Sequence, residues 1–407
     1  MGHAFLRRSL PDSQPPRLNL DLPGPVLLIG NYFPPLSGGS PVVMRNLLQW
    51  FDPTDYIIAT ESPPKNCSLI EALTGAKIYY TSRQHSKFDR VNVALSYAQI
   101  LLIASRISKL ARQNKCAVIV GVFPELDYLY AAYLVHSWTG LPLVIYLHDT
   151  IIENYLTGYR KILAKWLQPR LFKHASLIWV MSHGMTDMLR ERYHIDTTPL
   201  VHCFNETIPG TPPPWHKKNT DPLKIFFSGN IYTVNEAVLT RIVKGVGLIP
   251  GVQLNIYGGN SQEFLMRGGL LAPQVQAGYL RSRKALLDFM ATQDVFVLGL
   301  SWPQESSAGE HELKTAFPTK IPEYLAQGKP IIVHCPEDYF LGRFFREHQC
   351  GLVVSTPAEH AITQAVEEIK NYPAKALALG KNALKAARIF QGYQVARQFQ
   401  SGLQSLF

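Results

Sequence analysis

The sequence predicts an α/β protein built from two doubly wound, Rossmann-like domains that face a central cleft. Short apolar runs alternate with longer amphipathic segments along the chain, which is typical of parallel sheets with helical crossovers. At 407 residues the chain is too long for one ordinary core. A polar, Pro-rich stretch divides the apolar runs into two sets. Because ligands of such sheets bind at the carboxyl ends of the strands, the expected site lies between the domains.

The apolar runs give the expected strands. In the first half they lie at residues 26–30, 56–59, 77–81, 117–121, 143–147, 177–180 and 200–203. In the second half they lie at residues 223–227, 253–257, 275–279, 295–298, 330–334 and 351–354. The expected organisation is a disordered tail at 1–23, an N-terminal domain at 24–205, a linker at 206–222, a C-terminal domain at 223–390 and a terminal helix at 391–407.

Composition limits the partners and the compartment. The formal charge is +10, with 20 Lys and Arg against 15 Asp and Glu both in residues 1–210 and in residues 211–407. An excess spread this evenly, without a recognition motif, fits an anionic substrate or membrane surface and argues against a nucleic-acid partner.

Targeting signals and cysteines point to the cytoplasm. Arg7 and Arg8 are followed by no apolar core, so the N-terminus does not resemble a secretory signal. No apolar run is long enough to span a bilayer. The five cysteines lack Cys-x-x-Cys spacing and suggest buried thiols in a reducing compartment; they are Cys67, Cys116, Cys203, Cys335 and Cys350. We expect a cytoplasmic protein, with any membrane contact peripheral and at the inner face.

A glycine-rich loop follows the first expected strand. Residues 29–40 contain a Pro-Pro pair and then Gly38, Gly39 and Ser40 before a helical pattern at 42–50. Glycines let a backbone approach a ligand, and the N-terminus of a helix favours an anion. The loop lacks a Gly-x-Gly-x-x-Gly pattern, which argues against a nicotinamide or flavin cofactor. An ordinary tight turn is the alternative.

A second anion site is predicted at residues 317–330. Thr319 is the expected helix cap, Pro322 lies in the first turn, Lys320 supplies a charge, and Glu323 is placed to accept from sugar hydroxyls. Gly328-Lys329-Pro330 and an apolar run end the segment. Alternatively, Thr319 only caps, Lys320 is solvated, and Glu323 pairs with a neighbouring base.

His148 and Asp149 follow the expected strand at 143–147 and therefore face the cleft. A histidine can accept or relay a proton near neutral pH, and an adjacent carboxylate can orient it or bind hydroxyls. A structural histidine is the alternative. Residues 155–173 combine aromatic and aliphatic side chains with five cations; this pattern favours a docked helix with a solvated basic face, with an interfacial helix on anionic lipid as the alternative.

The segment 317–330 resembles the donor element of the family 4 glycosyltransferases, in the subgroup with a Pro-Thr/Ser-Lys step before Glu-Tyr. The resemblance covers roughly residues 25–390. It implies the GT-B fold, a nucleotide-sugar donor, retention of anomeric configuration and a terminal helix that crosses back to the first domain. It assigns Gly38, Gly39, Ser40, Thr319 and Lys320 to the donor phosphates, and Glu323 to the ribose.

The same resemblance assigns His148 and Asp149 to catalysis near the acceptor. It assigns the loop with Gly258 and Gly259 to the donor, and the backbone of the segment containing Tyr279, Leu280 and Arg281 to the nucleotide base.

Two positions depart from the family pattern. Where most members carry a second Glu, eight residues before Glu323, this chain has Thr315. Asn230 stands where the family usually has Arg after the first strand of the second domain. We expect Lys320 to meet the phosphate charge first, with Arg281 or Arg283 as further candidates. The acidic candidates to replace the missing carboxylate are Glu305, Glu310 and Glu312.

We therefore expect a glycosyltransferase that moves a hexose-type sugar from a nucleoside diphosphate to a hydroxyl of a glycan or lipid-linked saccharide, as in polysaccharide biosynthesis. No cofactor beyond the donor and no metal is expected, because the sequence shows no Asp-x-Asp motif and no His/Cys cluster. The alternatives are a nucleotide-sugar epimerase of GT-B type and a catalytically weak partner subunit, the latter suggested by Thr315 and Asn230.

Overall fold

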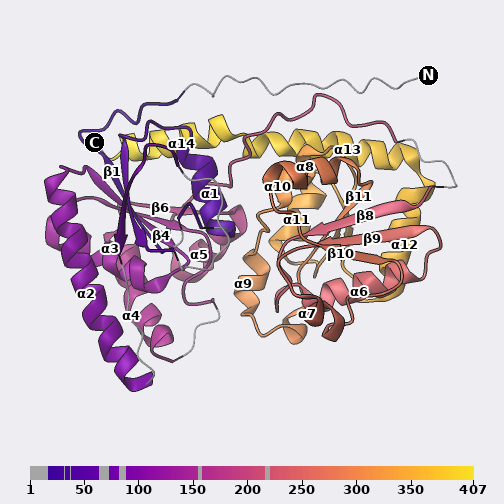
Figure 1. Ribbon diagram of the computed structural model, residues 1–407, viewed down its shortest axis with the longest axis horizontal. Helices are drawn as coiled ribbons and strands as arrows, with labels where there is room; N and C mark the ends of the chain where they lie inside the picture. The colour runs from indigo at the N-terminus through magenta and orange to yellow at the C-terminus, as the bar shows by residue number, and fades with distance from the viewer. Residues whose placement is uncertain are drawn as a thin grey trace.

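The chain folds into two sheet-centred domains that lie side by side (Figure 1). The computed structural model describes residues 17–31, 33–36, 38–63, 73–81, 89–154, 158–215 and 221–407. Parts of the sequence-based expectations fall outside these residues: the tail over 1–16, Cys67, part of the linker at 216–220, and residues 155–157 of the expected basic helix.

The first domain is built on a parallel sheet of seven strands in the order β3-β2-β1-β4-β5-β6-β7. Its strands are β1 (Val26–Ile29), β2 (Tyr56–Glu61), β3 (Lys77–Thr81), β4 (Val118–Phe123), β5 (Leu143–Leu147), β6 (Leu177–Val180) and β7 (Thr198–Pro199). Its helices are α1 (Gly39–Leu48), α2 (Asp89–Gln113), α3 (Leu126–Thr139), α4 (Gly158–His174) and α5 (His183–Tyr193). The strand order reverses between β1 and β4, so a crevice is expected where β1 ends.

The second domain repeats the plan with six parallel strands in the order β10-β9-β8-β11-β12-β13. The strands are β8 (Leu223–Ser228), β9 (Val252–Tyr257), β10 (Val275–Gly278), β11 (Val295–Gly299), β12 (Ile331–His334) and β13 (Leu352–Val354). The helices are α6 (Glu236–Gly247), α7 (Gln262–Arg267), α8 (Arg283–Ala291), α9 (Glu310–Thr315), α10 (Ile321–Ala326), α11 (Phe340–Glu347), α12 (Glu359–Asn371) and α13 (Pro373–Ala387), with 3-10 turns η1 (Pro303–Glu305) and η2 (Arg388–Phe390). Here the strand order reverses between β8 and β11.

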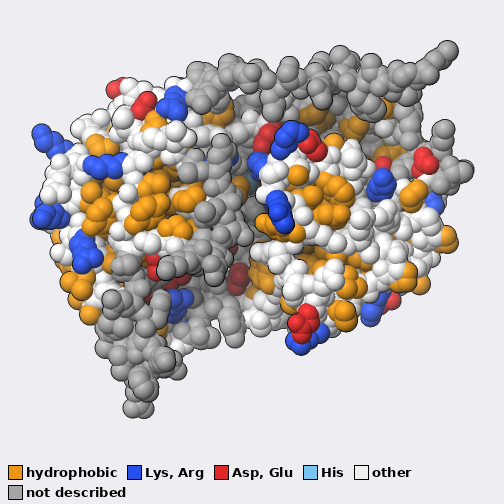
Figure 2. All heavy atoms as spheres, viewed as in Figure 1, with side chains coloured by type: hydrophobic (Ala, Val, Ile, Leu, Met, Phe, Trp, Pro, Cys, Tyr) orange, Lys and Arg blue, Asp and Glu red, His pale blue; other side chains and the backbone are white. Residues whose placement is uncertain are grey.

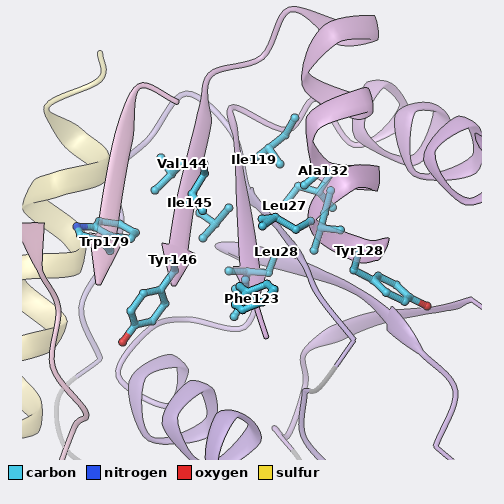
Figure 3. Close-up of a cluster of buried hydrophobic side chains, with 14 of the residues drawn as sticks. Leu27, Leu28, Ile119, Phe123, Tyr128, Ala132, Val144, Ile145, Tyr146 and Trp179 are labelled. Atoms are coloured by element: carbon cyan, nitrogen blue, oxygen red, sulfur yellow. The ribbon is translucent and has the colours of Figure 1, made fainter. Parts of the chain in front are cut away.

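The cores explain why the apolar runs become strands. Central strands covered on both faces carry continuous apolar sequence, and β1, β4 and β5 are buried along their whole length. Figure 3 shows the packing of the first domain, where Leu27 and Leu28 of β1 lie among side chains from β4, β5 and α3. In the second domain, one buried cluster includes Phe296 and Tyr324, and another includes Ile225 and Val297.

The expected strand at 200–203 is wrong. Pairing with β6 ends at Thr198–Pro199, because the chain then leaves the sheet towards the second domain. Phe204 instead forms an isolated parallel bridge with Gln391. This bridge joins the two segments at which the chain passes between the domains.

The terminal helix α14 (Gly392–Gln404) packs on the first domain, beyond the second-domain helix α13 (Figure 1). Val395, Phe399 and Leu403 belong to the first core. The Phe399 ring lies 4.8 Å from the ring of Trp179. The last helix therefore completes the domain in which the chain began.

The tail also differs from its prediction. Residues 17–23 were expected to be disordered, yet Leu20 is buried against the first core. The Leu20 amide donates to Asp55, and Gln404 donates to the Leu20 carbonyl at 3.0 Å. Order begins here because α14, distant in sequence, supplies the partners.

Candidate active site between the domains

The glycine-rich loop and the Thr319–Glu323 segment meet across the cleft. Gly38, before α1, has a φ of 137° that favours glycine. A Cβ added to Gly39 would lie 3.7 Å from Cγ2 of Thr319. The N-terminus of α1 thus faces the start of the second predicted anion site; Ser37 lies outside the described residues.

Ser40 and His148 also come together. The Ser40 hydroxyl lies 2.6 Å from Nδ1 of His148, and the imidazole stands edge-on to Tyr146 at a centroid distance of 4.4 Å. Burial, with a smaller contribution from His202, lowers the pKa of His148 to about 3. The ring is therefore neutral near pH 7. Its buried Nε2 makes no hydrogen bond to the residues that the structure describes, and it is a donor in the tautomer in which Nδ1 accepts from Ser40.

Asp149 lies in the cleft opposite groups of the second domain. Its side chain is exposed, yet the protein around it raises its carboxyl pKa. Burial and then the charges of Asp149 and Glu312 raise the pKa of Tyr232 to about 12, although Tyr232 is 54% exposed. A group that is open to water but flanked by protein on two sides is what a deep cleft produces. Asp149, Tyr232 and Glu312 therefore line one region.

The position of the missing family carboxylate has a structural occupant. Thr315 ends α9, where its hydroxyl donates to the His311 carbonyl at 2.8 Å. Its own carbonyl accepts from Ser182 of the first domain at 3.2 Å. Thr315 therefore joins the domains and presents no carboxylate.

The three glutamates expected as replacements have different surroundings. Glu305 pairs with Arg241, and Glu310 pairs with Lys314 at 2.8 Å. Glu312 is the member of this trio that acts on Tyr232. Of the three, it is therefore the one placed near Tyr232.

Lys320 and Glu323 lie within one turn, though not as the cap was predicted. Helix α10 begins at Ile321 with Lys320 as its cap residue and no side-chain cap bond, so the expectation that Thr319 caps the helix is wrong. The Thr319 carbonyl instead lies 3.1 Å from Nδ1 of His202. Within the described residues, Lys320 makes no salt bridge and no side-chain hydrogen bond.

Glu323 is a buried carboxylate with one free oxygen. Its side chain is 1% exposed; Oε1 accepts from Arg283 at 2.9 Å, and Oε2 has no hydrogen-bond partner among the described residues. Burial acts to raise the pKa of Glu323, but Lys320, Arg283 and His202 together lower it. The group is therefore ionised, with an acceptor atom left over.

The expected base and donor loops border a hollow of about 200 Å³ at the ends of β8, β9 and β10. Gly258, Gly278 and Tyr279 line it, whereas Gly259, Leu280 and Arg281 are adjacent to the lining residues. A Cβ on Gly258 would overlap the Gly229 carbonyl oxygen. Asn230, in the place of the family's Arg, accepts from the Gly259 amide at 3.1 Å, so it shapes the loop without supplying charge.

The sequence analysis misjudged the role of one residue of the candidate site, Arg283, and missed two others, His202 and Tyr232. Arg283 was a candidate for phosphate, but it is held by Glu206 and Glu323. Nε2 of His202 accepts from the Asn46 amide at 3.1 Å and its Nδ1 donates to the Thr319 carbonyl, so His202 bridges α1 and the donor segment. Tyr232 gave no sequence signal beyond its place after β8. In the described part of the chain, no three His, Cys, Asp or Glu side chains gather as metal ligands.

Comparisons with known proteins bear on the fold and on the first domain. Residues 37–205 match the family described as Glycosyltransferase Family 4. No curated protein matches. Sucrose-phosphate synthase from Thermosynechococcus elongatus superposes with a TM-score of 0.71 at 14% identity, over 94% of this chain and 99% of that one.

Anabaena HepE in complex with UDP and glucose gives a TM-score of 0.66 at 13% identity, over 94% of this chain and all of that one. The lipopolysaccharide outer core galactosyltransferase WaaB gives 0.62 at 12% identity, over 94% and 99%. The chain thus has the GT-B fold of these glycosyltransferases, and its residues 37–205 are similar to Glycosyltransferase Family 4.

Proposed function

We propose that the protein transfers a hexose-type sugar from a nucleoside diphosphate sugar to a hydroxyl of a glycan or lipid-linked saccharide. The observation that carries the proposal is the meeting of α1, His148 and the Thr319–Glu323 segment across one cleft. Two chain segments from different domains supply an anion site and a hydroxyl acceptor there. A UDP-sugar is the first donor to test, because HepE of the same fold was solved with UDP-glucose.

Each group has a role in this reaction. The N-terminus of α1 and the Lys320 ammonium meet the diphosphate, whose negative charge grows as the glycosidic bond breaks. The free oxygen of Glu323 accepts from a ribose hydroxyl. Nε2 of neutral His148 donates to the transferred sugar or the acceptor, and Asp149 binds hydroxyls at the same place. The resemblance to family 4 supports transfer with retention, which the anomeric configuration of the product tests.

The test of the donor site is a thermal-shift screen against UDP, GDP, CMP and their common sugar conjugates. A ligand that binds only the folded state raises the melting temperature by mass action. We expect one nucleotide class to stabilise the protein, and Lys320→Ala and Glu323→Ala to reduce the shift. Lys370→Ala is the matched control, because Lys370 is an exposed lysine at the end of α12. Absence of any shift contradicts the proposal and favours a partner subunit.

Turnover separates the remaining alternatives. A transferase releases nucleoside diphosphate in the presence of an acceptor, whereas an epimerase changes the donor without one. A protein that binds nucleotide but does neither is a binding subunit.

A basic and apolar face on the first domain favours a membrane-bound acceptor. Helix α4 contains no Asp or Glu in its 17 residues. Ile162 is 71% exposed and Trp166 40% exposed, and the Arg170 guanidinium lies 4.1 Å from the Trp166 ring centroid. We define this face by ten exposed apolar and basic residues of α2 and α4, which are Leu101, Leu102, Arg106, Lys109, Lys161, Ile162, Lys165, Trp166, Arg170 and Lys173.

The two helices adjoin at one end, where the rings of Tyr97 and Tyr159 lie 6.2 Å apart. On the side drawn in Figure 2, the first domain shows hydrophobic side chains together with separate Lys and Arg side chains. Apolar side chains among cations are typical of surfaces that enter the headgroup region of anionic lipid. None of the helices in the described part of the chain combines the length and apolarity that crossing a bilayer requires.

We therefore propose peripheral binding through this face. Sedimentation with vesicles rich in anionic lipid, at low salt, should retain the protein. Ile162→Ser with Trp166→Ser should release it, and so should high salt. The matched control is Leu248→Ser, because Leu248 is 63% exposed on the second domain. Equal binding to neutral and anionic vesicles, or none to either, would refute this part of the proposal.

A further inference from the structure

Glu206, the first residue of the linker, contacts Arg283, which in turn contacts Glu323 of the proposed donor site. The chain crosses between the domains at residues 202–206, where successive side chains contact the first and the second domain in turn. Asn205 donates to the Asn46 carbonyl of α1 at 2.8 Å and accepts from Trp50. Phe204 lies in the core of the second domain. Glu206, which follows, faces Arg283 at the start of α8.

Arg283 holds two carboxylates at once. Its Nε and Nη2 donate to the two oxygens of Glu206, the second at 2.8 Å, and its Nη1 donates to Oε1 of Glu323 at 2.9 Å. A bidentate pair fixes both the plane and the position of a guanidinium. The plane of Arg283 is therefore set by Glu206, and the third donor is left aimed at Glu323.

We propose that Glu206 is a positioning residue of the donor site, acting through Arg283 to orient the Glu323 carboxylate so that its free oxygen faces the ligand. This inference rests on the proposed function, because it assigns that oxygen to a nucleotide hydroxyl. It also places the beginning of the linker in direct contact with the binding machinery. A ligand on Glu323 is then sensed at the crossing between the domains.

Neutralising Glu323 does not require Glu206. Arg283 alone balances one carboxylate, and Lys320 and His202 also act on Glu323. Glu206 and Arg283 are each 27% exposed, whereas Glu323 is 1% exposed. Without its bidentate partner, the Arg283 side chain gains alternative orientations towards solvent. The expected consequence is a misdirected Glu323 rather than an unfolded domain.

The experiment is calorimetric titration of UDP into the full chain and its variants. Glu206→Gln keeps the size of the side chain but cannot accept at both ends from Arg283. We expect about tenfold weaker UDP binding, the effect of one lost charge-assisted hydrogen bond, with kcat within about twofold of the parent. Asp288→Asn is the control, because it breaks the exposed Lys284–Asp288 pair on the same helix; it should bind UDP like the parent.

Two further readouts separate positioning from a merely structural role. In an Arg283→Gln background, Glu206→Gln should have no additional effect on UDP affinity. The loss caused by Glu206→Gln should also shrink for 2′,3′-dideoxy-UDP, which lacks the hydroxyls assigned to Glu323. Full additivity with Arg283→Gln, or an equal loss for the dideoxy nucleotide, overturns the inference.

The outcome can be told apart from failure of the proposed function. If the parent binds no UDP at all, the donor assignment fails. A double-mutant cycle of Glu206→Gln and Glu323→Gln in urea unfolding then still measures whether the two carboxylates are coupled through Arg283. Non-additive effects support the positioning link, and additive effects refute it.

Discussion

Substituting Gly184 by Ala should separate the two domains while leaving each one folded. Gly184 is the second residue of α5, and a Cβ there would lie 2.6 Å from both Cβ and Cγ of Phe340 in α11 of the other domain. Overpacking of this kind costs about 1–3 kcal/mol. The cost falls on the contact between domains, so the closed arrangement should lose about 5- to 150-fold in population relative to an open one.

The substitution has an opposite effect within the helix. Alanine is the better helix former by roughly 1 kcal/mol, so α5 itself gains stability. We therefore expect an unchanged or slightly higher melting temperature, a larger radius of gyration in small-angle X-ray scattering, and a raised KM for the donor. Gly309→Ala should act alike, because its Cβ would overlap the Glu153 carbonyl oxygen of the first domain.

Gly210→Ala is the matched control, because no atom lies within 4 Å of a Cβ at that position. Its scattering and kinetics should equal those of the parent. If Gly184→Ala scatters and turns over like Gly210→Ala, then Phe340 yields without opening the cleft, and the reasoning is refuted.

Three further perturbations test individual groups. His148 has a pKa of about 3 in the folded state, below the value of about 6.5 in the unfolded state, so the folded state binds fewer protons. The free energy of unfolding should therefore fall as pH drops from about 6.5 towards 3, by at most about 1.4 kcal/mol per pH unit. Urea unfolding of His148→Gln should show a flatter pH dependence than the parent, and an unchanged pH dependence would contradict the assignment. Lys320→Ala removes a charge-assisted contact worth about 1.5–3 kcal/mol, so donor KM should rise roughly 10- to 150-fold, and a change under twofold would place the phosphates elsewhere. The Cβ of Gly258→Ala would overlap backbone, whereas the Cβ of Gly259→Ala would lie 2.9 Å from the movable side-chain amide of Asn230. Gly258→Ala should therefore abolish stabilisation by the nucleotide, and Gly259→Ala should keep most of it. Equal stabilisation of the two variants would show that the hollow is not part of the donor site.

The fold was predictable because its signal is local. β5 and β6 have the boundaries that their apolar runs indicate, and strands buried on both faces leave little ambiguity. The error at 200–203 has a different origin. This mostly apolar segment passes between two domains, where the Cys203 carbonyl accepts from Asn46 of α1 and the next residue, Phe204, donates to the Phe390 carbonyl. A segment buried at a domain crossing can therefore have the same composition as a buried strand.

The candidate site was predictable only in part. Lys320, Glu323 and His148 could be predicted because charged or titratable side chains lie there at the end of a strand or helix, where functional residues are often found. Which partners they take depends on contacts distant in sequence: Ser40 reaches His148 over 108 positions, and Arg283 reaches Glu206 over 77. Residue spacing carries no information about such pairs. For the same reason Arg283 looked like a phosphate ligand, although two carboxylates already occupy it.

The distribution of positive charge explains why both domains are needed for the proposed donor. A diphosphate brings about two negative charges, whereas the N-terminus of α1 contributes roughly half a charge and Lys320 one more. Asn230 supplies none, and the two carboxylates that Arg283 contacts, Glu206 and Glu323, outweigh its single positive charge by one. Neither domain alone therefore offers enough positive charge for the ligand. The contact between the domains brings α1 against Thr319. It also excludes water, which has a high dielectric constant, so the attraction between the diphosphate and these positive groups becomes stronger. If the proposed function is correct, the contacts of Gly184, Thr315 and His202 between the domains contribute to the free energy of donor binding, because they hold together the two halves of the anion site.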